Sequence, residues 1–487
     1  MKKTIGILLC LFVMILPLFA SGRTQGSGGA TELTWYVGGA GAQADTPAVL
    51  AEANKYLAEK LNVSLNIIES DWGSYTQKMQ MIIASQENYD MCYTANWANN
   101  FYTNVSRDAF VALDNLINQY APELKASLPA NGWEAAKVKG KIYAVPNEQI
   151  WPYTNQVTIE TSYLDRYNMN RDSVTTLAGI ESLLAQIKRD NPSMYPLGAN
   201  QGAPFTALIT YLGLDELAGR NIPGVILLTD SSLKVVNQFE LPQVLEAFRT
   251  IRQWYEKGYI RPDAETITNI TPERQAGRHP VYFGGNYKPG GEIQDKINHG
   301  GRDVICVPIS PSWQTTSGIV ATMTAISVTS KAPEKAMQFI NLVNTDKYIY
   351  NLITQGIEGK HYTKIDANYI RPIANSGYTP NADWMYGNQF LAYYKEGQNP
   401  TDWEDTKVIN NTARPSPALG FSFDSTPVAS ELASINSVVN EYANSLGVGS
   451  VDPDRVMPEF LEKLRNAGSQ RFIDEIQRQL DAWKASR

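Results

Sequence analysis

Aromatic side chains stand beside carboxylate or amide side chains at five places in this chain of 487 residues. The five groups are Asp71-Trp72-Gly73, Asn96-Trp97-Ala98-Asn99-Asn100, Glu148-Gln149-Ile150-Trp151, Gly284-Gly285-Asn286-Tyr287 and Trp384-Met385-Tyr386-Gly387-Asn388. An indole or phenol ring can stack on the apolar C–H face of a pyranose, and Asp, Glu, Asn and Gln can hold its hydroxyl rim. The chemistry that these groups predict is non-covalent binding of a sugar.

Eight residues of these groups are our candidates for ligand binding. We expect stacking from Trp72, Trp97, Trp151, Tyr287 and Trp384, and hydrogen bonds to hydroxyls from Asp71, Glu148 and Asn286. Glu358, in a glycine-flanked turn, and Asn388 are weaker candidates. Core packing is the ordinary role of tryptophan, and we expect it for Trp133 and Trp483. Four of the five groups follow predicted strands, where open α/β sheets bind ligands, which favours the binding role.

Other site chemistry finds little support in the sequence. His279, His299 and His361 do not stand at metal-ligand spacing from one another or from Cys or acids, so we expect no metal. There is no G-x-S-x-G elbow and no Walker loop, and Gly38-Gly39-Ala40-Gly41 departs from the dinucleotide pattern, so we expect no cofactor. A carboxylate pair for glycoside hydrolysis stays open as an alternative, with Asp71, Glu148 and Glu358 as members.

Strands and helices that alternate along the chain must position these groups. Such alternation predicts α/β units with parallel strand pairing. The expected strands cover residues 33–37, 63–68, 89–93, 142–146, 280–283, 303–307 and 322–328. The expected helices cover residues 75–85, 114–120, 133–138, 176–189 and 245–255, one that opens at Pro333, one that opens at Pro453 and a last one around residues 472–483.

Composition limits the class of protein. Hydrophobic residues make up 43% of the chain and charged residues 19%, which excludes a disordered chain, a collagen and a coiled coil. The length indicates two or three domains. The net charge of -7 gives no sign of a polyanion partner, so we do not expect nucleic acid to bind.

The N-terminus has the anatomy of a signal peptide over residues 1–22, followed by a linker over residues 23–30. Lys2 and Lys3 precede an apolar run from Ile5 to Ala20, and small residues follow. A lipoprotein signal requires a cysteine where Gly22 stands, and Cys10 lies too deep in the apolar run. We therefore expect an exported, periplasmic protein rather than a lipid-anchored one. Cys92 and Cys306 remain, and free buried thiols are the simpler expectation than a disulfide.

Seven further stretches resemble a known family in both sequence and order. They are GKIYAVPN (140–147), WYEKGYIRPD (254–263), AGRHPVYFGGNY (276–287), TAISVTSKAPEKAMQFINLV (324–343), GIEGKHY (356–362), LGFSFD (419–424) and EIQRQLDAW (475–483). The chain resembles the family 1 extracellular solute-binding proteins of ABC importers, which are maltose-binding-protein-like. The last three stretches resemble a branch with a C-terminal extension of unassigned role.

The resemblance implies an α/β clamp of the periplasmic-binding-protein type. Each of two lobes would contain a mainly parallel sheet flanked by helices, and the chain would cross between the lobes about three times. We expect an N-terminal lobe of residues 31–147 plus 328–372 and a C-terminal lobe of residues 148–327 plus 373–487, which includes the helical extension.

The function that the resemblance implies is capture without catalysis. A monomer would hold a sugar, expected to be an oligosaccharide, in the cleft between the lobes and deliver it to the permease subunits of an ABC transporter. Two alternatives stay open: a secreted glycoside hydrolase, and the same clamp with a peptide or another polar organic solute. No Arg or Lys stands inside the five groups, which favours a neutral solute, although Lys288 and Lys360 lie close by.

Overall fold

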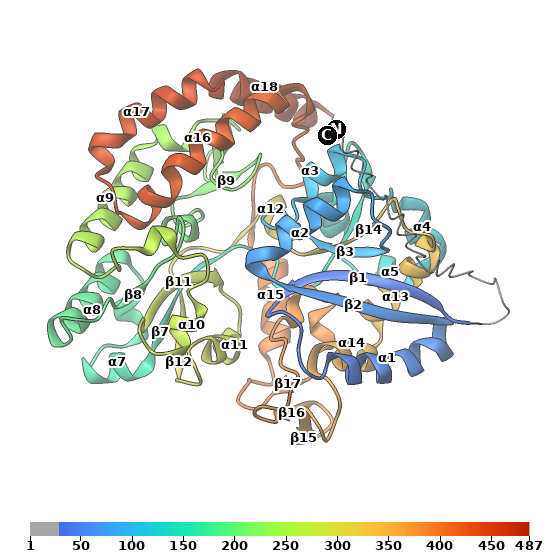
Figure 1. Ribbon diagram of the computed structural model, residues 1–487. Coiled ribbons are helices and arrows are strands. Elements are labelled where there is room, and N and C mark those ends of the chain that lie inside the picture. Colours follow the sequence, from blue (N-terminus) through green and yellow to red (C-terminus); the bar gives the residue numbers. More distant parts are fainter. Residues whose placement is uncertain (1–28, 487) are drawn as a thin grey trace, which may run out of the picture.

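The computed structural model describes residues 29–486, so the predicted signal peptide and most of the linker lie outside the described residues. Two bodies lie side by side (Figure 1), and each has its own hydrophobic core. We call them the first lobe, built around Trp35 and Phe339, and the second lobe, built around Trp254 and Phe283. The expected two-lobed α/β architecture is confirmed.

The first lobe contains a five-stranded sheet of order β2-β1-β3-β14-β6. These strands are β2 (Val63–Asp71), β1 (Thr31–Gly39), β3 (Met91–Thr94), β14 (Met323–Ile326) and β6 (Ala144–Pro146). The helices of this lobe include α1 (Thr46–Leu61), α2 (Trp72–Ala84), α3 (Phe101–Ser106), α4 (Asp114–Tyr120), α5 (Pro122–Ser127), α6 (Ala130–Ala135), α13 (Pro333–Thr345), α14 (Lys347–Gln355) and α15 (Asp402–Thr412). In α1, the buried side chains of Val49, Ala53 and Leu57 recur every fourth residue and face the core.

The second lobe contains a four-stranded sheet of order β12-β7-β11-β8. These strands are β12 (Val304–Pro308), β7 (Asn155–Glu160), β11 (Val281–Asn286) and β8 (Leu197–Gly198). Its helices include α7 (Thr161–Arg166), α8 (Leu177–Asp190), α9 (Pro242–Glu256), α10 (Thr271–Gln275) and α11 (Gly291–Asn298). Proline at the first position of α9 suits a helix start, and Val244, Phe248 and Ile251 form its buried stripe.

Strand pairing differs from the mainly parallel sheets that the alternation predicts. β1 pairs with β2 and with β3 in parallel, whereas β14 is antiparallel to both of its neighbours. In the second lobe, only β11 and β8 are parallel, and β7 is antiparallel to β11 and to β12. Strands β7 and β14 enter their sheets from the opposite lobe. They are not linked to a neighbour through a βαβ crossover, which is the connection that imposes parallel pairing.

The chain passes between the two cores three times, in agreement with the expected number of crossings. The passages lie between Trp151 and Val157, between Ile309 and Ile319, and between Trp403 and Ala418. The three segments are held together by backbone pairing. Tyr153 forms an antiparallel bridge to Trp313, and β13 (Trp313–Gln314) pairs in parallel with β18 (Arg414–Pro415).

Core membership differs from the expected division of the chain at two places. The buried side chains of Tyr378, Met385 and Trp403 belong to the first core, although residues 373–487 were all expected in the second lobe. Ile319 and Met323 also belong to the first core. A hydrophobic pattern shows that a segment has a buried face but does not show which of two cores covers that face.

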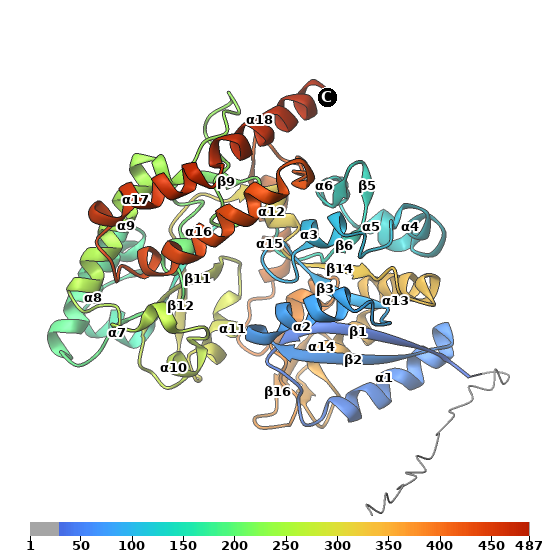
Figure 2. The same cartoon turned by 45° about the horizontal axis from the view of Figure 1, so that its top comes forward.

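The C-terminal helices complete the core of the second lobe. They are α16 (Ala429–Val448), α17 (Pro453–Asn466) and α18 (Ser469–Ala485); α16 and α17 pack on α9, and α18 packs on α16 and α17 (Figure 2). Phe460 packs against Phe239 with ring centroids 4.8 Å apart, and Phe472 packs edge-on against Phe423 at 5.4 Å. A Cβ atom on Gly447 would lie 2.3 Å from the backbone oxygen of Gly202, so only glycine permits this close approach.

Cys92 and Cys306 are both free and buried, one in each lobe, which confirms the free-thiol expectation. Within residues 29–486, no helix combines the length and the apolar character that a membrane crossing requires. The same residues hold no group of three or more His, Cys, Asp or Glu side chains placed to bind a metal ion.

Candidate ligand-binding site

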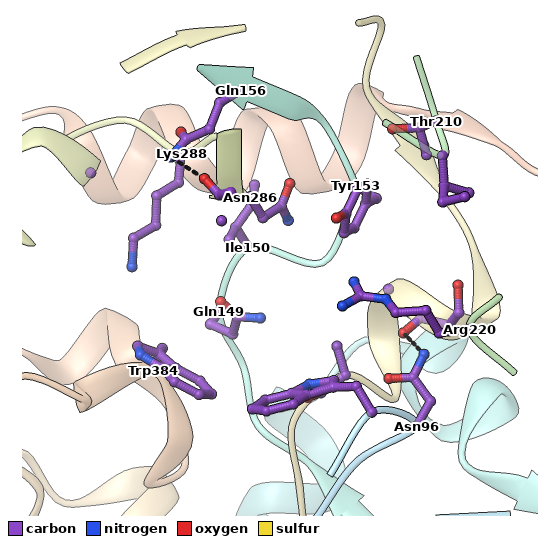
Figure 3. A pocket seen from close by; sticks show the side chains of 18 of the residues that line it. Asn96, Gln149, Ile150, Tyr153, Gln156, Thr210, Arg220, Asn286, Lys288 and Trp384 are labelled. Carbon is purple, nitrogen blue, oxygen red and sulfur yellow. Dashed lines mark hydrogen bonds between the residues drawn. The ribbon is translucent and has the colours of Figure 1, made fainter. Parts of the chain in front are cut away.

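A cavity of about 550 Å³ lies between the two lobes (Figure 3), within the size range of small-molecule sites. The first lobe contributes Trp72, Trp97 and Trp384 to its lining. The second lobe contributes side chains from β11, α11 and the segment around β9 (Leu214–Glu216), and the crossing segments contribute Gln149, Tyr153 and Ser317. The cavity therefore has one wall on each lobe and the crossing segments beside it.

Three indole rings form the wall on the first lobe, which we call the tryptophan platform (Trp72, Trp97 and Trp384). Trp72 and Trp384 are stacked with an interplanar angle of 14° and centroids 5.8 Å apart. Trp97 lies 5.1 Å from Trp72 and donates a hydrogen bond from Nε1 to the carbonyl oxygen of Ala321. Tyr93, fully buried, meets the rings edge-on. The platform offers a ligand a fixed aromatic surface.

Two features of the first lobe set the position of Trp72. The Asp71 carboxylate caps α2 by accepting hydrogen bonds from the backbone N–H groups of Gly73 and Ser74, so Trp72 is the first helical residue. A Cβ atom on Gly38 would lie 2.3 Å from the Trp72 ring. The glycine-rich turn after β1 therefore provides room for an indole, and Asp71 orients the platform without lining the cavity.

Amide, hydroxyl and phenol groups form the opposite wall. The side-chain oxygen of Asn286 accepts a hydrogen bond from the backbone N–H of Thr154 at 2.7 Å, and its Nδ2 donates to the oxygen of Pro152 at 2.6 Å. Gln156 donates to the oxygen of Gly284 at 3.1 Å. Such contacts fix the orientation of the wall, where Tyr153, Thr210 and Asn286 lie around the open space in Figure 3.

Six charged residues also line this cavity, and of these the sequence had pointed only to Lys288. They are Arg220, Arg274, Lys288, Asp215, Glu216 and Asp295. The guanidinium of Arg274 lies 3.9 Å from the centroid of the Tyr282 ring and 3.4 Å from an oxygen of Asp295. Burial raises the pKa of Asp215 to about 6 and that of Glu216 to about 7. The five sequence groups contain no Arg or Lys, but the cavity does. Their absence from those groups therefore no longer favours a neutral solute.

A buried network behind the second wall supports Arg274. Its Nε donates to Nε2 of His299 at 3.2 Å, and the other ring nitrogen of His299 lies 3.2 Å from Oε1 of Glu160. Arg302 donates from Nε to the same Glu160 oxygen at 2.8 Å. The side chains of Glu160 and His299 are 3% and 0% exposed. The Glu160 carboxylate thus pairs with Arg302 on one side and, through His299, helps to hold Arg274 on the other.

Four of the eight main candidates line the cavity: Trp72, Trp97, Asn286 and Trp384. Asp71, Glu148, Trp151 and Tyr287 do not, nor do the weaker candidates Glu358 and Asn388. The structure brings together candidates from four segments that are distant in sequence. It also adds Tyr153, Tyr282 and the charged residues, for which no motif gave a signal.

Each candidate outside the cavity has another role. Trp151 is 1% exposed and donates from Nε1 to the oxygen of Asn147, as core packing requires. The ring of Tyr287 lies 5.9 Å from the guanidinium of Arg171. Glu358 pairs with Lys364 at 2.9 Å, and Asn388 caps a short turn by accepting from the N–H of Phe390. Glu148 is partly buried beside the first crossing.

We expect Glu148→Gln to stabilise the protein at pH 8 and to have little effect near pH 4.5. Burial raises the pKa of Glu148 from 4.5 to about 7, so the folded state holds its proton more tightly than the unfolded state. The stability from this group is complete below pH 4.5 and is lost as the pH rises through 7. Glutamine never acquires the buried charge, so the expected gain at pH 8 is on the order of 2 kcal/mol. Urea unfolding at both pH values measures it.

Glu396→Gln is the matched control for this experiment. Arg371 lowers the pKa of Glu396 by hydrogen bonding, which is the opposite direction, and both side chains are exposed. This variant is expected not to gain stability at pH 8. An equal gain from both variants, or a gain for Glu148→Gln that persists at pH 4.5, would contradict the assignment.

Two lobes, three crossings and a cavity between the lobes define a two-lobed ligand-binding protein. The chain belongs to the bacterial extracellular solute-binding proteins, because the model of that family matches residues 51–357. A domain of unknown function (DUF3502) matches residues 417–485, which cover the C-terminal helices. The family consists of exported binding proteins and not of enzymes, which confirms the binding interpretation over the hydrolase alternative.

Similar proteins agree with this membership. A carbohydrate ABC transporter substrate-binding protein of Streptococcus pneumoniae serotype 4 is 30% identical over 440 residues, 89% of this chain and 87% of that protein. The crystal structure of the N-glycan transport solute-binding protein NgtS from Streptococcus pneumoniae, in complex with Man5GlcNAc, is 29% identical with a TM-score of 0.82, covering 94% of this chain and 99% of that one. An extracellular solute-binding protein from Bifidobacterium longum subsp. infantis shares the fold. It is 15% identical with a TM-score of 0.63, covering 94% of this chain and 99% of that one.

Proposed function

We propose that this protein captures an oligosaccharide between its two lobes and delivers it to the permease subunits of an ABC importer. The observation that supports this most directly is the tryptophan platform facing a wall of amide and hydroxyl groups across one cavity. Stacked indoles match the C–H face of pyranose rings, and amides match hydroxyls. The relatives named above, which carry carbohydrates or an N-glycan, support the same ligand class.

Ligand capture would proceed through a shift between open and closed forms of the clamp. Only a closed form contacts the ligand from both lobes at once, so the ligand favours it by the additional contacts. The three crossing segments, paired through Trp313 and Arg414, are short and adjacent, as a hinge requires. The permease would then recognise the closed form. We place this cycle in the periplasm, with a monomeric protein.

A thermal-shift screen tests the function. The panel contains mannose- and N-acetylglucosamine-containing oligosaccharides, maltooligosaccharides and, as the competing class, short peptides. A ligand that binds only the folded state at 100 times its Kd stabilises the protein by about 2.7 kcal/mol, which raises the melting temperature. We expect oligosaccharides to produce this rise and peptides to produce none. Stabilisation by peptides without any by saccharides would overturn the proposal.

A further inference from the structure

We propose that the ligand of this protein carries a carboxylate group, as a uronic or sialic acid residue does, and that Arg220 binds it at one end of the cavity. The inference rests on the proposed function and specifies the class of saccharide. The region involved begins just after β9, where the second lobe faces the platform. Arg220 extends from there toward the open space of the cavity (Figure 3).

Arg220 differs from the other cations of the cavity in its contacts. Arg274 is paired with Asp295 and hydrogen-bonded to His299. Lys288 donates from Nζ to the side-chain oxygen of Gln389 at 3.3 Å. Within residues 29–486, no hydrogen bond from the Arg220 side chain occurs and no carboxylate lies within 4.0 Å of it. Its donor groups are therefore available to a ligand.

The nearby carboxyl groups already have partners on the protein. Asp215 accepts a hydrogen bond from the Ser416 hydroxyl, and Glu216 accepts one from the backbone N–H of Asn221 at 2.7 Å. Asp295 accepts from Thr158 at 2.7 Å, in addition to its pair with Arg274. The acids that share the cavity with Arg220 thus have hydrogen-bond partners elsewhere. The charge of Arg220 lowers the pKa of Glu216, but burial outweighs this effect and raises that pKa to about 7.

If the ligand were neutral, closure of the lobes would desolvate the charge of the Arg220 guanidinium, which is energetically unfavourable. The lobes would remove water from Arg220, and Glu216, the carboxyl group that interacts with it electrostatically, has a pKa raised to about 7 by burial, so it balances the guanidinium only in part. A desolvated charge that is not fully compensated is strongly unfavourable. A ligand carboxylate would supply the remaining countercharge through two parallel N–H···O bonds, the geometry that guanidinium favours. The amide wall and the platform would remain available for the neutral sugar rings.

The surroundings of Arg220 suit the acidic end of a saccharide. A small side cleft continues from the main cavity at this point, and both are lined by Asn96, Ser317, Arg220 and the two acids Asp215 and Glu216. The side-chain oxygen of Asn96 is buried and has no hydrogen-bond partner within the described part of the chain. It can accept from a ligand hydroxyl next to the carboxylate. Cation, acceptor and space therefore occur together at one end of the cavity.

Titration calorimetry with matched saccharide pairs tests this inference on the full-length protein. One series compares sialylated oligosaccharides with their desialylated forms, and a second compares uronate-terminated oligosaccharides with the corresponding neutral sugars. We expect the acidic member to bind at least about tenfold more tightly in one series, and the affinity to fall as salt is added. The two series distinguish the source of the carboxylate.

Arg220→Gln should remove the preference, because the acidic member loses at least about tenfold in affinity and the neutral member changes little. Arg189→Gln, the same change on an exposed helix outside the cavity, should leave both affinities unaltered. Equal or tighter binding of the neutral members would overturn the inference, as would a preference that survives Arg220→Gln. Absence of binding by any saccharide would instead count against the proposed function.

Discussion

Replacing Trp384 with alanine is expected to weaken saccharide binding by about 30- to 1000-fold, or about 2–4 kcal/mol. Trp384 is stacked with Trp72 and lies 6.4 Å from Trp97, so its loss removes one of the three rings of the platform and leaves Trp72 without its stacked neighbour. Aromatic anchors in desolvated pockets give effects of this size. Isothermal titration calorimetry with the saccharide from the screen measures the change.

Tyr287→Ala provides the matched aromatic control. Its ring contacts Arg171 and does not line the cavity, so we expect an affinity close to that of the unmodified protein. Trp384→Phe, which keeps a smaller ring, should lie between the two. A larger loss from Tyr287→Ala than from Trp384→Ala would show that the ligand binds elsewhere. Circular dichroism at the assay temperature confirms that each variant is folded.

Replacing Glu160 with alanine is expected to destabilise the protein by about 3–5 kcal/mol, because it removes the buried carboxylate that pairs with Arg302 and leaves the fully buried His299 ring without its partner. Arg302 lies 2.8 Å from the Glu160 carboxylate, and His299 joins that carboxylate to Arg274. Removing one member of a buried charge network costs far more than removing one member of an exposed pair. Chemical denaturation at constant pH measures the free energy of unfolding.

Glu396→Ala is the exposed counterpart of this substitution. It breaks the surface pair with Arg371, where both side chains are about half exposed, and should cause a much smaller loss. Glu160→Gln, which keeps hydrogen-bonding capacity and removes only the charge, should fall between the two. Comparable losses from Glu160→Ala and Glu396→Ala would refute the view that burial makes the Glu160 network important.

The sequence was sufficient to predict the two-lobed architecture, and four of the eight main candidate residues line the cavity. Trp72 and Trp97 follow strands that the hydrophobic pattern identifies, and the ends of such strands meet beside the cavity. Trp151 also follows a predicted strand, but it turns into the core. Sequence proximity to a strand end could not distinguish these cases, because the direction of a side chain depends on the path of the loop.

Asn286 and Tyr287 were both predicted to bind the ligand, but only Asn286 lines the cavity. Successive side chains of a strand point to opposite faces, so two neighbours do not both face one cavity. Tyr282, Gly284, Gly285 and Asn286 line the cavity, whereas Tyr287, the residue after the end of β11, does not. Alternation alone would have favoured Tyr282 over Tyr287 once Asn286 was assigned.

The charged lining could not be found from local sequence. Arg220 stands near a short strand, and Arg274 stands in a five-residue helix that precedes the sheet strand β11. They meet only because the second lobe folds both segments toward the first. Long-range packing of this kind leaves no periodicity or motif in either segment.

The packing of α16–α18 has a practical consequence for dissecting this protein. Phe460, Phe472, Ile476 and Leu480 are all 0% exposed in the core of the second lobe. A recombinant fragment that stopped near residue 416 would present the apolar partners of these side chains to water and would be prone to aggregate. The C-terminal helices are thus an inseparable part of one lobe, so any exchange of this region between relatives has to preserve the surface on which it rests.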